Sequence, residues 1–190
     1  MIEPETLLSA YAQGIFPMGM PSGEIGWFSP DPRGILPLES FHIPHGLARR
    51  LRRNPFEIRI NTAFVEVMRG CAAREETWID DEIITSYTRL YELGFAHSVE
   101  AWREGQLVGG LYGVALGGAF FGESMFHRET DASKVALVAL VHRLRERHFS
   151  LLDIQWTTPH LERFGAIEIP RRTYLQKLRK ALQQQVVFYP

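Results

Sequence analysis

Hydrophobic positions repeat with two different periods in the larger, C-terminal part of the chain. Apolar residues recur at helical spacing in several segments, which are residues 63–68, 82–93, 131–147 and 171–182. Other segments alternate apolar and polar residues or form short apolar runs, as strands do, at residues 56–60, 96–102, 106–116, 118–126 and 151–156. Helices, successive antiparallel strands, a long helix and a further strand predict the α+β class.

Local signals mark where some of these elements begin and end. Gly94 is placed to cap the C-terminus of the preceding helix, and Glu104-Gly105 is placed for a tight turn between antiparallel strands. Asp131 is placed to cap the N-terminus of a helix that runs to about Arg147. We therefore expect an antiparallel meander followed by one long, buried helix.

The N-terminal part of the chain has a different composition, and the change falls near Asn54-Pro55. Prolines and glycines punctuate residues 1–54 too often for long regular elements. Aromatic residues such as Trp27 argue against a disordered linker. The sequence therefore predicts a small, loop-rich lobe at residues 1–54 and a main domain at residues 55–190.

Composition narrows the class of protein. The chain has 190 residues, 45% of them apolar, and a net charge of -1. It can therefore bury a sizeable core, and it is not a wholly basic nucleic-acid-binding protein. Its single cysteine, Cys71, cannot form an internal disulfide, and the first residues do not resemble a secretory leader, so we expect a cytoplasmic protein. No segment approaches the roughly 20 apolar residues that span a bilayer, so no membrane partner is expected.

Polar residues inside a strand-like segment form the first candidate site. On a strand, Asp153 and Gln155 share one face, while Ile154 points to the core on the other. Residues two apart on a strand are separated by about 6 to 7 Å, so one substrate group can meet both side chains. The alternative is that Asp153 and Gln155 are ordinary solvent-facing residues, and the pattern alone does not decide.

Glu123 is the second candidate, because apolar residues and glycines surround it between Phe120 and Phe126. A ligand-binding carboxylate is the favoured interpretation, and a buried ion pair with an arginine is the alternative. Phe120 and Met125 are candidates for the wall of an apolar pocket or for the core. Strict alternation puts them on opposite faces, so a shared pocket requires a β-bulge, for which Gly122 is the expected place.

A compact basic cluster comes before the main domain and consists of Arg49, Arg50, Arg52 and Arg53. Such a cluster can bind phosphates by charge-assisted hydrogen bonds, which is the footprint expected for an RNA partner. A solvated helix face is the alternative. The aromatic side chains of Trp27, Phe28 and Trp78 are candidates either to stack an unpaired base or to fill the core.

The sequence contains no recognisable metal or cofactor motif. His127 and His160 lack the spacing of metal ligands and have no Ser or Cys partner in a triad, so we assign them no chemistry and predict no metal site. Neither a Gly-x-Gly-x-x-Gly pattern nor a P-loop occurs. We therefore predict no cofactor.

Several ordered sequence blocks together resemble one known family. The blocks are Tyr11 with Gly14 to Pro17, Trp27 to Arg33, Thr77 to Ile79, Ala96 to Glu100, Gly122 to Phe126, Asp131 to Lys134, and Gly165-Ala166 with Glu168 to Arg171. They are similar to the leucyl/phenylalanyl-tRNA–protein transferase family, over almost the whole chain. The resemblance implies a main domain like that of the acetyl-CoA-dependent N-acetyltransferases (GNAT), with a mainly antiparallel mixed sheet flanked by helices. It also implies an aminoacyltransferase that moves leucine or phenylalanine from aminoacyl-tRNA to an N-terminal Lys or Arg, marking the acceptor protein for N-end-rule degradation.

The same resemblance implies roles for single residues. Gln155 is expected to contact the attacking amine, and Asp153 to orient it or help to remove its proton. Glu123 is expected to hold the acceptor's cationic end or the donor's amino group. Trp78 is expected to stack the terminal adenine, and the basic cluster to bind the acceptor stem. The pocket for the aminoacyl side chain is expected at Leu111, Phe120, Met125 and Leu140, with Ser124 as a further substrate-binding residue. The donor is an activated ester, so no metal or covalent intermediate is needed, and we expect a monomer.

The chain departs from the family at a few positions. It begins close to the Tyr11 block, so we expect a shortened N-terminal lobe, and Met18 stands where many members have a tryptophan. Leu111 and Leu140 replace a methionine and a phenylalanine that are common in the pocket, so methionine is a further candidate donor.

Two other functions remain open on sequence alone. The first is a GNAT-type N-acyltransferase that uses acetyl-CoA, but this requires a glycine-rich turn before a helix, and residues 127–132 contain no glycine. The second is a non-catalytic tRNA-binding protein, in which the basic cluster functions and Asp153 does not. Transfer activity distinguishes these possibilities.

Overall fold

A mixed β-sheet forms the centre of the protein. The computed structural model describes residues 1–53 and 56–190, so Asn54-Pro55, where the predicted domain boundary falls, lies outside the described residues. The sheet has the strand order β4-β5-β6-β7-β8-β3-β9, and a separate hairpin pairs β1 (Phe16–Gly19) with β2 (Ile25–Phe28). The strands of the main sheet are β3 (Arg33–Ile35), β4 (Glu57–Ile60), β5 (Ala96–Arg103), β6 (Gln106–Leu116), β7 (Ala119–His127), β8 (Leu151–Gln155) and β9 (Ile167–Ile169). Neighbouring strands are antiparallel except β7 and β8, which are parallel.

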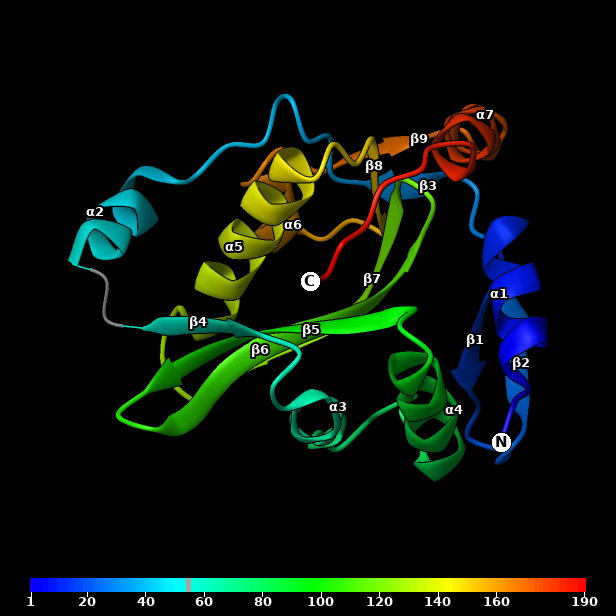
Figure 1. Ribbon diagram of the computed structural model, residues 1–190, viewed down its shortest axis with the longest axis horizontal. Helices are drawn as coiled ribbons and strands as arrows, with labels where there is room; N and C mark the ends of the chain where they lie inside the picture. The colour runs from blue at the N-terminus through cyan, green and yellow to red at the C-terminus, as the bar shows by residue number, and fades with distance from the viewer. Residues whose placement is uncertain (54–55) are drawn as a thin grey trace.

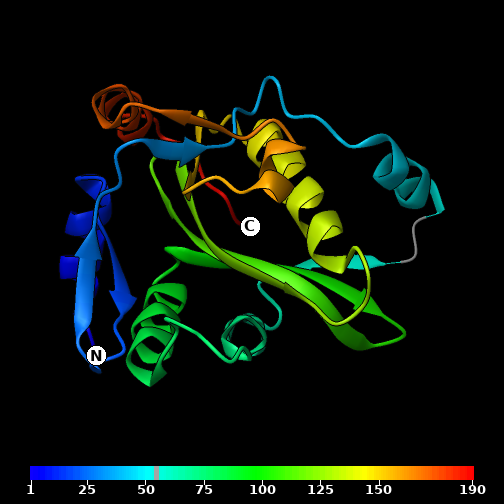
Figure 2. The same cartoon turned by 180° about the vertical axis from the view of Figure 1, so that it is seen from behind.

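Helices cover both faces of this sheet, which confirms the α+β class. The helices are α1 (Pro4–Ala12), α2 (His45–Arg53), α3 (Phe64–Ala72), α4 (Asp81–Glu92), α5 (Ala132–Glu146), α6 (Pro159–Glu162) and α7 (Arg171–Leu182). Figure 1 shows α5 across one face of the sheet and α3 with α4 on the other. In the view from behind, α1 and the β1–β2 hairpin lie at one end and α2 at the opposite end (Figure 2). Of the described helices, none has the length and apolar character to cross a membrane.

Most predicted elements of the main domain are present. The bounds of β6 and α7 match the prediction, and α3 is longer than predicted, because it continues to Ala72. Gly94 has a φ of 86°, the left-handed conformation expected of a helix C-terminal glycine. The predicted cap at Asp131 is wrong, since its side chain makes no capping hydrogen bond and instead pairs with Arg50 and Lys134.

The N-terminal segment contains regular elements and contributes to the main sheet. Besides α1 and α2 it forms the hairpin of β1 (Phe16–Gly19) and β2 (Ile25–Phe28). Its strand β3 lies inside the main sheet, between β8 and β9. A Cβ atom at Gly34 would lie 2.6 Å from the backbone of Trp156, so glycine permits this close pairing. The lobe predicted at residues 1–54 is therefore not separate from the sheet of the main domain.

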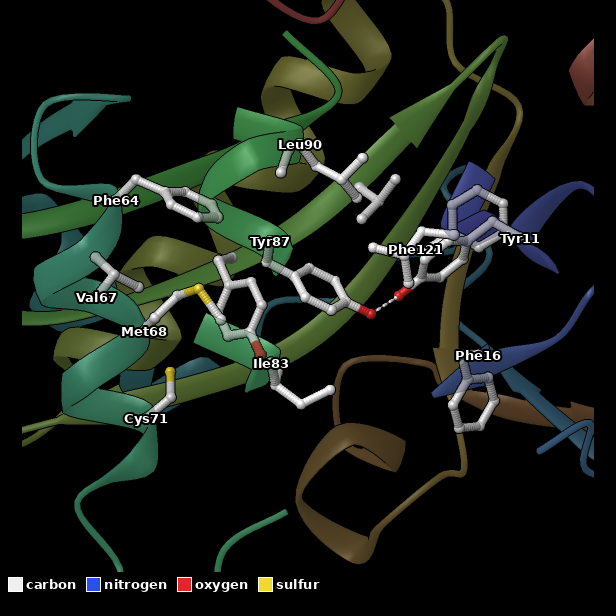
Figure 3. Packing of buried hydrophobic residues seen from close by; sticks show 14 of the residues in the cluster. Tyr11, Phe16, Phe64, Val67, Met68, Cys71, Ile83, Tyr87, Leu90 and Phe121 are labelled. Atoms are coloured by element: carbon white, nitrogen blue, oxygen red, sulfur yellow. Dashed lines mark hydrogen bonds between the residues drawn. The ribbon is translucent and has the colours of Figure 1, made fainter. Parts of the chain in front are cut away.

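Two hydrophobic cores lie on opposite faces of the sheet. One is formed with α1, α3, α4 and α7, and Figure 3 shows Tyr11, Tyr87 and Phe121 converging in it. The other lies under α5, and the C-terminal tail closes it with Phe188, which is 2% exposed. Helix α5 is apolar around much of its circumference because it is buried in this second core. The sheet therefore positions side chains of β7 and β8 between the two cores.

Candidate active site

A β-bulge in β7 sets the geometry of the site. Tyr112 of β6 pairs with Ser124, but Gly113 pairs with Gly122, so Glu123 is an extra residue without an opposite partner. The bulge restores Met125 to the face that carries Phe120, and both pack in the core under α5. This confirms the bulge predicted at Gly122.

A cavity of about 320 Å³ opens beside the bulge. The parallel pairing of β7 with β8 ends at Phe121 and Asp153, and beyond it residues 122–125 of β7 and Ile154 of β8 line the cavity. Its wall includes six of the residues predicted to bind substrate: Trp78, Leu111, Glu123, Ser124, Met125 and Leu140. Leu137, Leu152 and Ile154 extend the apolar surface. A cavity of this size is typical of sites for small ligands.

Phe120 is the exception among the predicted wall residues. It is fully buried and packs against Phe188, with ring centroids 5.1 Å apart, and within the described part of the chain it is not one of the residues that line the cavity. It belongs to the same hydrophobic core as the wall residues Leu111, Met125 and Leu140.

Glu123 places a carboxyl group in the wall of this mainly apolar cavity. It is 9% exposed, accepts a hydrogen bond from the hydroxyl of Tyr11, and accepts another from Nε2 of Gln155 at 3.2 Å. The Tyr11 hydroxyl in turn contacts that of Tyr87 (Figure 3). Burial raises the pKa of Glu123 to about 8, the Tyr11 hydrogen bond opposes this rise, and the charge of Asp153 adds to it. Among the described residues no arginine forms a direct ion pair with Glu123, so that alternative is wrong.

Asp153 forms the ion pair instead. Its carboxylate accepts two hydrogen bonds from Arg33, at 3.1 and 2.7 Å, and one from the Tyr174 hydroxyl at 2.7 Å. Both members of the pair are 1% exposed at the side chain. The guanidinium lies over the rings of Phe16 and Tyr174, 4.9 and 4.3 Å from their centroids. The alternative of a solvent-facing Asp153 is therefore wrong.

Gln155 connects Asp153 to Glu123. Its backbone N–H donates to Oδ1 of Asp153 at 2.8 Å, and its side-chain amide donates to Glu123. The residue has a φ of 69°, a left-handed conformation that a non-glycine residue seldom adopts. Asp153 and Gln155 are both buried and, among the described residues, stand behind the cavity wall that Leu152 and Ile154 provide.

Comparison with known proteins decides the family. The family described as leucyl/phenylalanyl-tRNA protein transferase matches residues 35–179, and its N-terminal domain matches residues 1–31. A transferase of this name from Akkermansia muciniphila is 59% identical over 189 residues, covering 97% of this chain and 98% of its own. One from Salinibacter ruber is 54% identical over 190 residues, covering 100% of this chain and 84% of its own. The chain belongs to the leucyl/phenylalanyl-tRNA protein transferase family. It is thus an aminoacyltransferase.

Solved structures are more distant from this family member. L-PGS from Bacillus licheniformis is 12% identical, with a TM-score of 0.47, and the match covers 83% of this chain and 52% of that one. The ribosomal-protein-alanine N-acetyltransferase from Brucella melitensis is 17% identical, with a TM-score of 0.42, over 64% and 89% of the two chains. The sequence relatives establish the transferase family.

Sequence reasoning missed several residues of the transferase site. The side chains that donate hydrogen bonds to Glu123 and Asp153 are those of Tyr11, Arg33 and Tyr174. Of these residues, Tyr11 and Arg33 were noted only as parts of the family's sequence blocks. The sequence signal that could have identified Arg33 is its place as a single arginine before Gly34-Ile35, in a short apolar run. His160, to which no chemistry was assigned, lies in the cavity wall.

The basic cluster of the transferase lies away from this cavity, on α2. Arg49, Arg50, Arg52 and Arg53 are exposed, while Leu47 anchors the helix with 4% exposure. Arg50 pairs with Asp131. The cluster thus forms the exposed face of an amphipathic helix, and RNA binding by this face stays a prediction. Among residues 1–53 and 56–190, no group of three or more His, Cys, Asp or Glu side chains is placed to hold a metal ion.

Proposed function

We propose that this enzyme transfers leucine or phenylalanine, and also methionine, from aminoacyl-tRNA to an N-terminal Lys or Arg of acceptor proteins, marking them for N-end-rule degradation. The observation that carries the proposal is the apolar cavity with the Glu123 carboxyl in its wall. Leu111, Met125 and Leu140 offer the surface for an unbranched, γ-branched or aromatic side chain. Valine and isoleucine would crowd the neck of such a cavity with their β-branch.

Glu123 is the group that receives the amine. The α-amino group of a peptide has a pKa of about 7.7 to 8.0, and burial raises the pKa of Glu123 to about 8. A proton can therefore pass between the two groups at little cost. In the transfer step the free amine attacks the ester carbonyl carbon, a C–N bond forms and the C–O bond to the ribose breaks. The proton that the amine loses ends on the ribose oxygen.

Asp153 and Gln155 act as positioning groups in this proposal. The Asp153 carboxylate accepts hydrogen bonds from Arg33, Tyr174 and the backbone N–H of Gln155. The last of these bonds holds Gln155 in its left-handed conformation. Gln155 then orients the Glu123 carboxyl through its amide. Such preorganisation is the main contribution needed when the donor is already an activated ester.

The RNA part of the donor requires surfaces outside the apolar cavity. Trp78 lies in the cavity wall, half-buried, and we assign it to stacking of the terminal adenine. The exposed arginines of α2 are assigned to phosphates of the acceptor stem. We propose that the enzyme acts as a monomer in the cytoplasm, where charged tRNA is present.

An acetyl-CoA-dependent acyltransferase is disfavoured by the start of α5. A pyrophosphate at a helix N-terminus binds to free backbone N–H groups and to the positive end of the helix. Here the Asp131 carboxylate stands at that end, and the preceding residues 127–130 contain no glycine. Residues 127–130 therefore lack the glycine that would let a pyrophosphate approach the backbone N–H groups of this turn.

Competing donors test the proposal. The protein is incubated with leucyl-tRNA, acetyl-CoA and a reporter peptide that begins with arginine, and the products are identified by mass. We expect addition of leucine, and no addition to a matched peptide whose N-terminus is blocked. Addition of acetyl groups, or no transfer at all, would contradict the proposed function.

A further inference from the structure

A second hollow, of about 230 Å³, lies beside the apolar cavity. The cations Arg50, Lys134 and Arg163 line it together with His160. Among the described residues, His160 is the one that belongs to the walls of both hollows. Its ring is held edge-on against Phe164, with centroids 5.6 Å apart. The basic hollow therefore adjoins the cavity proposed for the aminoacyl group.

The positive charge of this hollow is only partly neutralised. Asp131 supplies the single carboxylate among its lining residues, and it pairs with Arg50 and with Lys134, the latter at 3.2 Å. Arg163 forms no ion pair with any residue that the structure describes. The three cations thus exceed the one carboxylate by two charges, and Lys134 remains 34% exposed.

The N-terminus of α5 adds to the positive charge of this hollow. Lys134 lies in the first turn of α5, where the helix end is itself positive, and that turn carries no acidic residue. Burial lowers the pKa of His160, and the charges of Lys134 and Arg163 lower it further. These effects favour the neutral, hydrogen-bonding form of His160, while the cations beside it attract negative charge.

We propose that Lys134, Arg163 and His160 form a subsite for backbone phosphates of the unpaired 3′ end of the donor RNA. The inference rests on the proposed function, because it is the aminoacyl group in the adjoining cavity that brings the RNA strand past His160. Arg50 of α2 also lines this hollow, whereas Arg49, Arg52 and Arg53 do not. The subsite holds the last nucleotides in place beside the reaction cavity, and these other three arginines of α2 face the body of the RNA.

Two donors distinguish this subsite from the reaction centre. Leucyl-tRNA carries the phosphates, and adenosine esterified with leucine has none. We expect Lys134→Gln to raise KM for leucyl-tRNA about tenfold, the usual effect of losing one charge-assisted hydrogen bond. KM for leucyl-adenosine should not change. The dependence of log affinity on log salt should flatten by about 0.7, the loss of one phosphate contact on a single strand.

Matched variants serve as controls. Lys177→Gln removes an exposed lysine from α7, outside both hollows, and should leave the KM for leucyl-tRNA unchanged. Lys134→Arg retains the cation and should restore most of the affinity. Equal losses with both donors, equal losses in the two Lys→Gln variants, or no loss in Lys134→Gln would overturn the subsite. Failure of the unmodified enzyme with both donors would instead contradict the proposed function.

Discussion

The guanidinium of Arg33 and the carboxylate of Asp153 form a buried ion pair between two adjacent strands, although the residues are 120 positions apart in the chain. Strand β3 pairs with β8 at Gly34 with Gln155 and at Ile35 with Asp153. The ion pair therefore ties the N-terminal segment to the strand that carries Gln155. Through Gln155 it also fixes the orientation of the Glu123 carboxyl.

Removal of Arg33 should strongly destabilise the protein. Arg33→Met leaves the Asp153 carboxylate buried without its counter-ion, which typically costs about 3 to 5 kcal/mol. The matched control is Arg89→Met, which breaks an exposed pair with Glu92 and should cost less than about 1 kcal/mol. Urea denaturation of both variants measures the difference in free energy of unfolding. Equal losses would show that burial of the Arg33 pair has no special importance.

Stability should depend on pH through Glu123. Its pKa is about 8 in the folded protein and near the usual value of about 4.3 when unfolded. Between these values the folded state binds more protons, so the free energy of unfolding decreases as pH rises from about 4 to about 8. Through Glu123 alone, the free energy of unfolding changes by at most about 1.4 kcal/mol for each pH unit in this range. Glu123→Gln should remove this part of the slope, and identical slopes in both proteins would contradict the assignment.

The size of the cavity should determine donor preference. Leu140 lies on α5 in the cavity wall and is 2% exposed. Leu140→Trp fills more of the space than the phenylalanine that is common at this position in the family, so kcat/KM for phenylalanyl-tRNA should fall about tenfold relative to leucyl-tRNA, a usual effect of crowding a hydrophobic pocket. The ratio of the two donors within one enzyme sample controls for loss of folded protein. An unchanged ratio would place the aminoacyl side chain elsewhere.

Tyr112 offers a test of buried polar groups. Its hydroxyl is the one buried side-chain polar atom without a hydrogen-bond partner among the described residues. Tyr112→Phe removes a buried hydroxyl that makes no hydrogen bond with the described residues. The free energy of unfolding should therefore stay the same or rise by up to about 1 kcal/mol. A loss of more than about 1 kcal/mol in thermal or urea unfolding would show that the hydroxyl has a partner.

Local patterns were sufficient to predict much of the main domain and one detail of the site. The strands of the meander are separated by turns that contain Gly105 and Gly117, so β6 could be bounded from sequence. The bulge at Gly122 followed from a conflict, because Phe120 and Met125 could share a pocket only if alternation was interrupted. Such features depend on neighbours in the sequence.

Long-range pairings were not predictable in the same way. Strand β3 has only three residues and lies among prolines and glycines, so its place beside β8 left no periodic signal. The Asp131 cap failed because Arg50, 81 positions away, competes for its carboxylate. His160 was overlooked because its neighbours in the cavity wall come from other strands and helices.

The kinetics of Glu123→Gln test the central claim most directly. Glutamine has the shape of glutamate but carries no charge and cannot accept the proton of the acceptor amine. We expect KM for a peptide that begins with arginine to rise at least about tenfold. KM for leucyl-tRNA should be unchanged, with a thermal unfolding curve that shows a folded protein. If the variant transfers leucine with the KM and kcat of the unmodified enzyme, Glu123 does not bind the acceptor and the account is wrong.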